Sequence, residues 1–403
     1  MNNKNLIAVA LTFILLLGPL GSYSQARAEA EAEAEAKSLM LFIGDGMGPG
    51  ILTIGLIFYR MELGSDLNMV TLANSGVTGY ANTYSADKLV TDSAASGTAI
   101  ACGSKTDNGK VGVLPDETPV ENIFDIALRQ GKSVGVVSTT SVTHATPACF
   151  TAHHKYRSYE WDIAQQVAES DAAVILGGGS KYFLPPERGG GRRDGDLTVV
   201  AEERGFEVVY DRDAMLASDA DRLLGLFAPE NTPMERERDA DSVPSLAEMT
   251  AKAIEILSRN ENGFILVVEG GRIDHAAHDN DIDDTLLDLL AFDEAVGYAM
   301  GYYAENPEVA LIVTADHDTG GPAITAGEGA YEGYPDIDQY HTFDDETSPV
   351  VRWVSGHHTA TMVPVIAAGP GRDRFTGIMD NTDIFYSMME ILGLEEGPHG
   401  SED

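Results

Sequence analysis

The stretch Ser38-Leu-Met-Leu-Phe-Ile-Gly-Asp-Gly46 decides the fold class of this chain. It is a short apolar run that ends in a carboxylate, Asp45, between two glycines. A continuous apolar run of this length is typical of a strand that is buried on both faces of a parallel sheet. The same pattern returns twice, because Phe264 to Gly271 and Ala310 to His317 are also apolar runs that lead into an acid.

The acids at these three strand ends, Asp45, Glu269 and Asp316, indicate a binding site. In open α/β sheets, ligands bind beyond the carboxyl ends of the strands. Acidic side chains are seldom buried without a partner, so packing alone hardly explains three of them in equivalent positions. We therefore expect the three carboxylates to meet at one edge of the sheet.

Strand and helix patterns alternate along the rest of the chain. Further strands are expected at 133–138, 172–176 and 363–367, and helices at 120–129, 161–167, 245–257 and 285–299. This alternation predicts an α/β fold, a three-layer α/β/α sandwich with a central, mostly parallel sheet. We expect residues 38–403 to form a single domain. Two stretches break the rhythm, at about 180–243 and 320–356, and we interpret them as excursions that form lids or surface loops near the site or an oligomer contact.

The N-terminus has the pattern of an export signal. Lys4 precedes an apolar run from Leu6 to Leu17, and Ala26-Arg-Ala28 fits a cleavage site. The run is short for a membrane span, so we expect a signal peptide over 1–28, with a retained lipophilic anchor as the alternative. The Glu-Ala alternation that follows predicts a flexible acidic N-terminus over 29–37. The mature protein is then expected in the periplasm or outside the cell, with no membrane contact beyond export.

The net charge of −38 excludes several classes of partner. An acidic surface repels nucleic acid and anionic membranes, and it also repels a free phosphate ester unless the site carries strong local positive charge. Such a surface suits a high-salt environment, where screening reduces self-repulsion, and halophily is therefore a hypothesis. With only Cys102 and Cys149, the chain is no disulfide scaffold, and we expect two buried free thiols.

Ser93 is the candidate nucleophile. The segment Val90 to Thr98 begins like a strand and continues with small residues that can start a helix, which places Ser93 near a helix N-terminus where anions are favoured. Taken alone, Asp92-Ser93 is better explained as a helix cap. A nucleophilic serine needs activation, and because no Ser-His-Asp arrangement is visible, metal coordination is the remaining route.

Metal-ligand residue types are plentiful in the chain. Asp274 and His278 stand one helical turn apart, so both side chains can face one ion. Zinc accepts mixed Asp/His sets, whereas carboxylates, hydroxyls and water suit magnesium. Any one of these residues alone is more simply a solvated or core side chain, and only their number at strand ends weakens that explanation. The other candidates are Asp45, Glu269, Asp316-His317 and His357-His358.

Several motifs together resemble the alkaline phosphatases. They follow in that family's order from Leu41 to about Gly371, and this order makes the resemblance strong although each motif alone is weak. The motifs are Ile43-Gly-Asp-Gly-Met-Gly48, Thr91-Asp-Ser-Ala-Ala-Ser-Gly-Thr-Ala99, Lys105-Thr-Asp-Asn-Gly109, Val268-Glu-Gly-Gly-Arg-Ile-Asp-His275, Thr314-Ala-Asp-His317 and His358-Thr359.

The resemblance implies two Zn²⁺ and one Mg²⁺. One zinc would be held by Asp274, His278 and His358, where His358 is preferred over His357 because Thr359 and a strand follow at the family's distance. The second zinc, which also contacts Ser93, would be held by Asp316, His317 and Asp45. Magnesium would be held by Asp45, Glu269 and Thr146.

The resemblance also implies a phosphate clamp. Asp92 would orient Arg157, whose guanidinium fork matches two phosphate oxygens; the alternative is an exposed charge at a helix start. Where some family members have Asp near the magnesium and Lys near the phosphate, this chain has His144 and His275, as in the animal-type enzymes. Imidazole is a softer donor, so His144 either reaches Mg²⁺ through water or accepts zinc, and the third metal is left open.

The implied activity is hydrolysis of small phosphate monoesters through a phosphoserine at Ser93. The family is often dimeric, so a homodimer is an option, although the sequence leaves the oligomeric state open. One alternative is a phosphodiesterase or sulfatase of the same superfamily, which typically uses threonine or a modified cysteine. A second alternative is a non-catalytic, acidic, secreted cation-binding protein, which accounts for the charge but not for acids at three strand ends.

Overall fold

A ten-stranded sheet forms the centre of the molecule in the computed structural model, which describes residues 35–325 and 350–395. Among the described strands of this sheet only one, β13, runs antiparallel to its neighbours. The order across the sheet is β14 (Gly377–Asp380), β2 (Val77–Asn82), β13 (Val363–Ala368), β8 (Val309–Thr314), β1 (Ser38–Gly44), β7 (Phe264–Gly270), β3 (Ser133–Ser141), β4 (Val174–Gly178), β6 (Leu223–Leu226) and β5 (Glu207–Val209).

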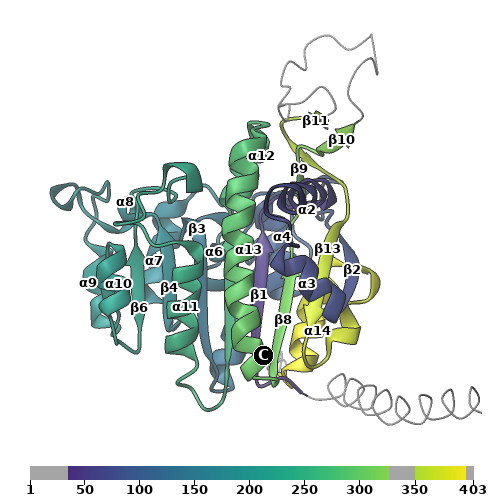
Figure 1. The fold of residues 1–403 in the computed structure, drawn as a ribbon. Helices are drawn as coiled ribbons and strands as arrows, with labels where there is room; N and C mark the ends of the chain where they lie inside the picture. Colours follow the sequence, from purple (N-terminus) through teal and green to yellow (C-terminus); the bar gives the residue numbers. More distant parts are fainter. Residues whose placement is uncertain (1–34, 326–349, 396–403) are drawn as a thin grey trace, which may run out of the picture.

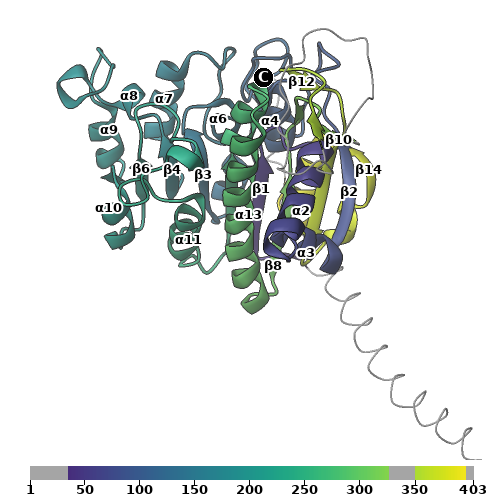
Figure 2. The ribbon, with the colours of Figure 1, turned by 45° about the horizontal axis from the view of Figure 1, so that its top comes forward.

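Helices cover both faces of this sheet (Figure 1, and Figure 2 in a tilted view). One face carries α3 (Asn68–Ser75), α11 (Leu246–Leu257) and α13 (Ile282–Glu305), and α2 (Pro49–Leu63) packs on α13. The opposite face carries α5 (Ile123–Arg129) and α6 (Ala145–Thr151) with α4 (Ser93–Cys102), which packs between α6 and α14 (Asn381–Ile391). The predicted three-layer α/β/α sandwich is confirmed.

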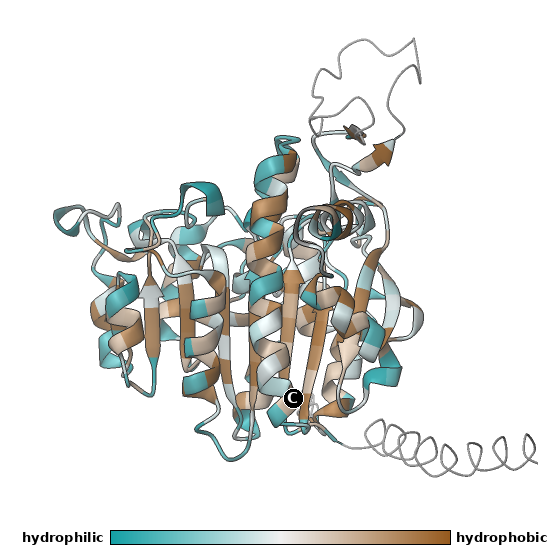
Figure 3. Ribbon diagram, viewed as in Figure 1, coloured by the Kyte–Doolittle hydropathy of each residue, from teal (hydrophilic) through white to brown (hydrophobic). Residues whose placement is uncertain are grey.

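The core lies along the middle strands. Every residue of β1, β7 and β8 is buried, which explains why their sequences are apolar without alternation. Figure 3 shows these strands as the continuous hydrophobic centre of the sheet. Phe42 of β1 meets Phe292 of α13 edge to face, with ring centroids 6.0 Å apart, so the central strand is locked to the helix layer.

The register of the central strands aligns their carboxyl ends. Ile43 of β1 pairs with Glu269 of β7 on one side and with Thr314 of β8 on the other. Asp45, which follows β1, therefore lies near the level of Glu269, the penultimate residue of β7, and of Asp316, which follows β8. The expectation that three acidic strand ends meet at one edge is confirmed.

The segment 180–243 differs from the predicted excursion in one respect. It contains the short helices α8 (Ser180–Phe183), α9 (Leu197–Glu203) and α10 (Arg212–Ala217), but it also supplies β6 and β5 to the sheet itself. Its Gly-, Arg- and Asp-rich composition hides these two strands because they are only four and three residues long.

The second predicted excursion, 320–356, is described only in part. Residues 323–325 (β10) and 350–352 (β11) pair as a small antiparallel sheet, and 326–349 lie outside the described residues. The predicted signal peptide at 1–28 and most of the acidic stretch at 29–37 also lie outside them. Cys102 and Cys149 are both free and buried, as predicted. Among the described helices, none is long and apolar enough to cross a membrane.

Candidate metal centre

Asp45 and Asp316 lie side by side where β1 and β8 end, and neither side chain is exposed. One oxygen of Asp316, Oδ1, accepts hydrogen bonds from the backbone N–H groups of Gly46 (3.1 Å) and His317 (2.9 Å). Its Oδ2 has no hydrogen-bond partner, and neither has either oxygen of Asp45. Buried carboxylate oxygens without donors are costly, so this arrangement favours a cation in contact with them.

Ser93 is the first residue of α4, the helix that faces these acids. Asp92 caps the helix, because its side chain accepts a hydrogen bond from the N–H of Ala95 at 3.0 Å. The helix consists of small residues and is buried along its whole length, so its N-terminus approaches the sheet edge closely. The Ser93 Oγ lies 3.2 Å from Nε2 of His317, and that nitrogen is 3.1 Å from Oδ2 of Asp316.

A first cluster gathers Asp274, His278 and His358. Asp274 and His278 both lie on α12 (Arg272–His278). His358 lies on β12 (His358–Thr359), which pairs with β9 (Asp318–Thr319). Nε2 of His278 is 3.4 Å from Oδ2 of Asp274, and Nε2 of His358 is 3.6 Å from Oδ1. His357 is exposed, so the structure brings His358 rather than His357 into the cluster.

The two imidazoles of this cluster fit a metal ion. Nδ1 of His278 contacts the carbonyl oxygen of Gly356 (2.8 Å), and Nδ1 of His358 contacts that of Thr91 (2.9 Å). A carbonyl only accepts, so each Nδ1 carries a proton, and in the neutral form of such a ring Nε2 is bare. The two Nε2 atoms are only 3.0 Å apart. Two facing lone pairs beside a carboxylate form a donor set for a cation such as zinc.

Asp45, Asp316 and His317 form a second cluster, and Asp45, His144 and Glu269 form a third; within each of these two, the potential ligand atoms all lie within 4.8 Å of one another. The hydroxyl of Thr146, Oε1 of Glu269 and Nδ1 of His144 are buried without hydrogen-bond partners. The other oxygen of Glu269, Oε2, accepts hydrogen bonds from the hydroxyls of Thr140 (3.0 Å) and Ser138. One side of the carboxylate is thus fixed by the protein, and the other side is left for an ion.

Burial dominates the electrostatics of the centre. It raises the pKa of Asp45, with neighbouring Asp316 adding to the effect, and it raises the pKa of Glu269 to about 7. Burial also lowers the pKa of His317 to about 4 and that of His144 well below its usual value. These pKa shifts mean that burial disfavours the charged forms of these carboxylates and imidazoles. A bound divalent cation would favour ionised carboxylates again, because its positive charge stabilises them.

Arg157 reaches the centre from the loop after α6. Its Nη1 pairs with Oδ2 of Asp92 at 3.0 Å, as expected from the sequence, and its Nη2 lies 3.0 Å from Nε2 of His144. His275 lies beside His144, with ring centroids 5.6 Å apart. The structure therefore brings every predicted site residue to one edge of the sheet, where the central strands end.

Sequence reasoning missed several side chains that support this centre. Arg272 places Nη1 at 2.9 Å from Nδ1 of His275, so that nitrogen accepts. Thr319 donates to Oδ1 of Asp274, and Ser138 and Thr140 hold Glu269. Their only sequence signal was adjacency: Thr319 follows the Asp316-His317 pair, and Arg272 precedes Asp274 within a quoted motif.

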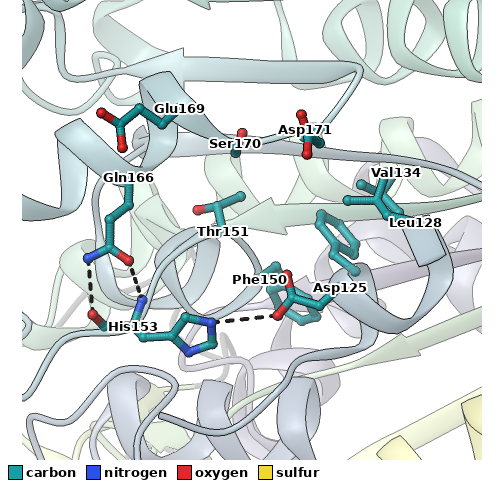
Figure 4. A pocket seen from close by; sticks show the side chains of 12 residues that line it. Asp125, Leu128, Val134, Phe150, Thr151, His153, Gln166, Glu169, Ser170 and Asp171 are labelled. Atoms are coloured by element: carbon teal, nitrogen blue, oxygen red, sulfur yellow. Dashed lines mark hydrogen bonds and ion pairs between the residues drawn. The ribbon is translucent and has the colours of Figure 1, made fainter. Parts of the chain in front are cut away.

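A separate pocket of about 260 Å³, shown in Figure 4, lies between α5, α6 and α7 (Glu160–Glu169). Its polar lining includes His153, whose ring lies 3.6 Å from Asp125 and whose backbone exchanges hydrogen bonds with Gln166. None of the predicted site residues lines it. The pocket therefore adds nothing to the chemistry of the centre.

Comparison with known proteins identifies an enzyme of the hydrolase class. A family model described as alkaline phosphatase matches residues 36–342. The chain is 36% identical to the repressible alkaline phosphatase of Saccharomyces cerevisiae over 73% of its own length, but it spans only 58% of that enzyme. It is 30% identical to alkaline phosphatase 4 of Bacillus subtilis, and the match covers 87% of each chain. The protein belongs to the alkaline phosphatase family.

Solved structures agree with this assignment. The alkaline phosphatase of Thermus thermophilus superposes with a TM-score of 0.83 at 32% identity, covering 91% of this chain and 93% of that one. The TAB5 alkaline phosphatase, in a mutant with one histidine replaced by aspartate, superposes with a TM-score of 0.77 at 30% identity. That match covers 90% of this chain and all of the TAB5 chain, and the mutant has Mg bound in its M3 site.

Proposed function

We propose that this protein hydrolyses small phosphate monoesters by two in-line displacements through a phosphoserine at Ser93. One observation carries the proposal: the Ser93 hydroxyl lies at a buried helix N-terminus, 3.2 Å from the imidazole of His317, beside carboxylate oxygens that have no other partner. The same nitrogen of His317, Nε2, faces that hydroxyl and also the carboxylates of Asp45 (3.5 Å) and Asp316 (3.1 Å). A general base of a catalytic triad would meet the acid through its other ring nitrogen, so this arrangement favours a metal ligand.

We assign the clusters to ions as follows. Asp274, His278 and His358 hold one Zn²⁺, and Asp45, Asp316 and His317 hold a second beside Ser93. Asp45, Glu269 and Thr146 hold Mg²⁺. When bound, the ions lower the pKa of the serine hydroxyl, stabilise the leaving alkoxide and supply the positive charge that an acidic protein needs around phosphate.

The chain's own residues position the phosphoryl group. The first backbone N–H groups of α4 and the helix dipole stabilise negative charge next to Ser93. Asp92 holds one side of the Arg157 guanidinium, so the remaining N–H groups can bind two phosphate oxygens. In the first step the serine oxygen bonds to phosphorus and the alcohol departs; in the second, water attacks phosphorus, the serine oxygen departs and phosphate is released.

We propose that His144 modifies metal binding at the third site and that His275 modifies binding of the phosphate. The contact between Nη2 of Arg157 and Nε2 of His144 makes that nitrogen an acceptor, which leaves Nδ1 protonated in the neutral ring. A protonated Nδ1 cannot bind a metal directly, so with this contact present His144 reaches the third ion through water. The TAB5 mutants with Mg in the M3 site, in which aspartate or glutamate replaces a histidine, support magnesium as the ion that a carboxylate would recruit there.

We propose an exported homodimer as the form of the enzyme. The export signal rests on the sequence alone. The dimer is supported by the end of the sheet, where Ile378 of β14 pairs with Tyr80 of β2 and their side chains are 70% and 42% exposed. An apolar pair on an open sheet edge is a surface that a second copy can cover. Light scattering after chromatography tests this, since Ile378→Lys should leave a monomer.

Metal analysis combined with substrate comparison tests the activity. The purified enzyme should contain zinc and should hydrolyse a nitrophenyl phosphate monoester much faster than the corresponding diester. A preference for the diester would favour the phosphodiesterase alternative. Ser93→Ala should abolish the phosphoenzyme, with Ser38→Ala, a buried serine at the opposite end of β1, as the matched control. Phosphate that stays covalently bound to Ser93→Ala would refute the nucleophile.

A further inference from the structure

Two buried polar side chains, Ser96 and Asn381, lie immediately outside the metal centre. Ser96 stands one turn after Ser93 on α4, and Asn381 is the first residue of α14; each is only 1% exposed. The Ser96 hydroxyl donates to the backbone carbonyl oxygen of Asp316 at 2.6 Å. The Asn381 amide donates from Nδ2 to the Ser96 Oγ at 2.9 Å.

Ser96 and Asn381 belong to a series of hydrogen bonds in which every proton points towards Asp316. The series begins at Lys105, whose ammonium group is donor-only and lies 2.7 Å from Oδ1 of Asn381. The amide oxygen therefore faces Lys105 and the amide N–H group faces Ser96. Since Ser96 accepts from the amide, its own proton goes to the Asp316 carbonyl, which can only accept. Hydrogen bonds aligned in series polarise and strengthen one another.

The last hydrogen bond of this series, from Ser96, fixes the backbone of Asp316, a proposed metal ligand. Two backbone N–H groups hold Oδ1 of the Asp316 carboxylate, and Ser96 holds the carbonyl of the same residue. With both groups fixed, Oδ2 of Asp316 and the ring of His317 have defined directions at the strand end. Because Ser96 and Ser93 share a helix, the same bond also sets the 3.2 Å separation between Ser93 and His317.

The ammonium group of Lys105 is occupied by other contacts as well. It donates to the carbonyl oxygen of Tyr84 at 2.6 Å, pairs with Asp380 at 2.9 Å and lies 3.9 Å above the Tyr84 ring. A cation held by four groups at the start of α14 is not available to a phosphate. The lysine of the quoted Lys105–Gly109 motif thus has no part in the mechanism above.

We propose that Lys105, Asn381 and Ser96 form a one-directional hydrogen-bond chain that positions the Asp316-His317 ligand pair against Ser93. They are positioning residues, and none of them touches substrate. The inference rests on the proposed function, because it concerns how the second metal site and the nucleophile are aligned. Its signature is a change in metal retention and kcat with substrate affinity preserved, since the Arg157 clamp is not part of the chain.

The decisive variant is Asn381→Asp, which keeps the shape of the side chain but makes it acceptor-only. The Ser96 hydroxyl is then drawn to the new carboxylate and leaves the Asp316 carbonyl without a donor. We expect zinc release to a coloured chelator about tenfold faster than in the wild type, and kcat about tenfold lower. KM and the inhibition constant of phosphate should stay within twofold. Ser96→Ala should behave in the same way.

Variants of Lys105 test the direction of the chain. Lys105→Met frees the amide to turn over and should give a smaller change of the same kind, whereas Lys105→Arg keeps a donor-only cation and should restore wild-type values. Asn122→Asp is the matched control, because it makes the same change at another residue that is 1% exposed and caps α5. Unfolding temperatures of all variants are measured alongside.

Two outcomes would overturn the proposal. The first is a wild-type rate of zinc release and an unchanged kcat in both Asn381→Asp and Ser96→Ala. The second is a loss of unfolding temperature with kcat and KM changed together, which would make the chain merely structural. Failure of the proposed function would give a different result. The wild type itself would lack monoesterase activity, whereas the rates of zinc release could still be compared between the variants.

Discussion

Replacing His144 with aspartate should convert the third cluster into a tight magnesium site. His144 is neutral, because burial and the nearby Arg157 lower its pKa well below the usual value. With Asp45 and Glu269 ionised around an ion, the donor set carries two negative charges, and His144→Asp adds a third at a position whose present side chain places a ligand atom within 4.8 Å of theirs. Aspartate also supplies the hard oxygen that Mg²⁺ prefers to imidazole.

The magnitude follows from opposing contributions. Two unit charges about 4 Å apart attract by about 4 kcal/mol at an effective dielectric constant near 20, and a divalent ion roughly doubles that. In the ion-free protein, burial and the two neighbouring carboxylates favour the protonated form of the new side chain, and losing that proton when Mg²⁺ binds offsets most of this gain, by several kcal/mol. A net of roughly 1–3 kcal/mol remains, which corresponds to Mg²⁺ binding about 5- to 150-fold tighter. Without the ion, repulsion among three carboxylates should lower the unfolding temperature.

Titration calorimetry of chelator-treated protein with Mg²⁺ measures the affinity, and thermal unfolding with and without Mg²⁺ measures the second effect. His144→Asn is the control, because it removes the ring in the same way but adds no charge. Equal Mg²⁺ affinity in His144→Asp and His144→Asn would refute the electrostatic reasoning. So would an apoprotein that unfolds at the same temperature in both variants.

Other expectations address the clamp, the metals, a buried acid and the surface. Arg157→Lys should weaken inhibition by phosphate about 10- to 100-fold, because lysine replaces a two-pronged contact with a single one; an unchanged inhibition constant would move the clamp elsewhere. EDTA should inactivate the enzyme and zinc should restore it, and activity that survives chelation would reject the metal mechanism. Asp288→Asn should raise the free energy of unfolding above pH 7 but not below pH 4: burial raises the pKa of Asp288 to about 7, so the stability that its protonated form contributes is full at low pH and is lost as the pH rises through that value. Urea unfolding across that range measures it, and equal gains at both ends would contradict the assignment. The unfolding temperature should rise between low and molar NaCl, because salt screens a net charge of −38, and no change would sink halophily.

The centre of the fold could be predicted because its strands are buried on both faces. Such strands leave a continuous apolar run in the sequence, and β1, β7 and β8 all show it. The edges of the sheet could not be predicted in this way. Strand β2 has mixed burial, and β14, β6 and β5 have four residues or fewer, so none of them carries a readable period.

Many of the candidate metal donors were also predictable, because they lie at or near strand ends within the motifs that resemble those of the family. The side chains that hydrogen-bond to these donors could not be predicted, because their positions depend on contacts between distant parts of the chain. The amide of Asn381 meets Ser96 across 285 positions, and no local pattern announces that pairing. Arg272 stood in view inside a motif, yet only the structure shows that its donor sets the state of His275.

The order in which strands enter the sheet has a consequence for how the enzyme is made. Strand β1 leaves the ribosome early, but its neighbours β7 and β8 are synthesised more than 200 residues later, and His358 later still. A half-made chain therefore carries Asp45 and Ser93 with nothing to complete them. Contacts so distant in sequence also slow folding. Active enzyme can appear only after nearly the whole chain is synthesised, and truncation before residue 358 should yield protein that never matures.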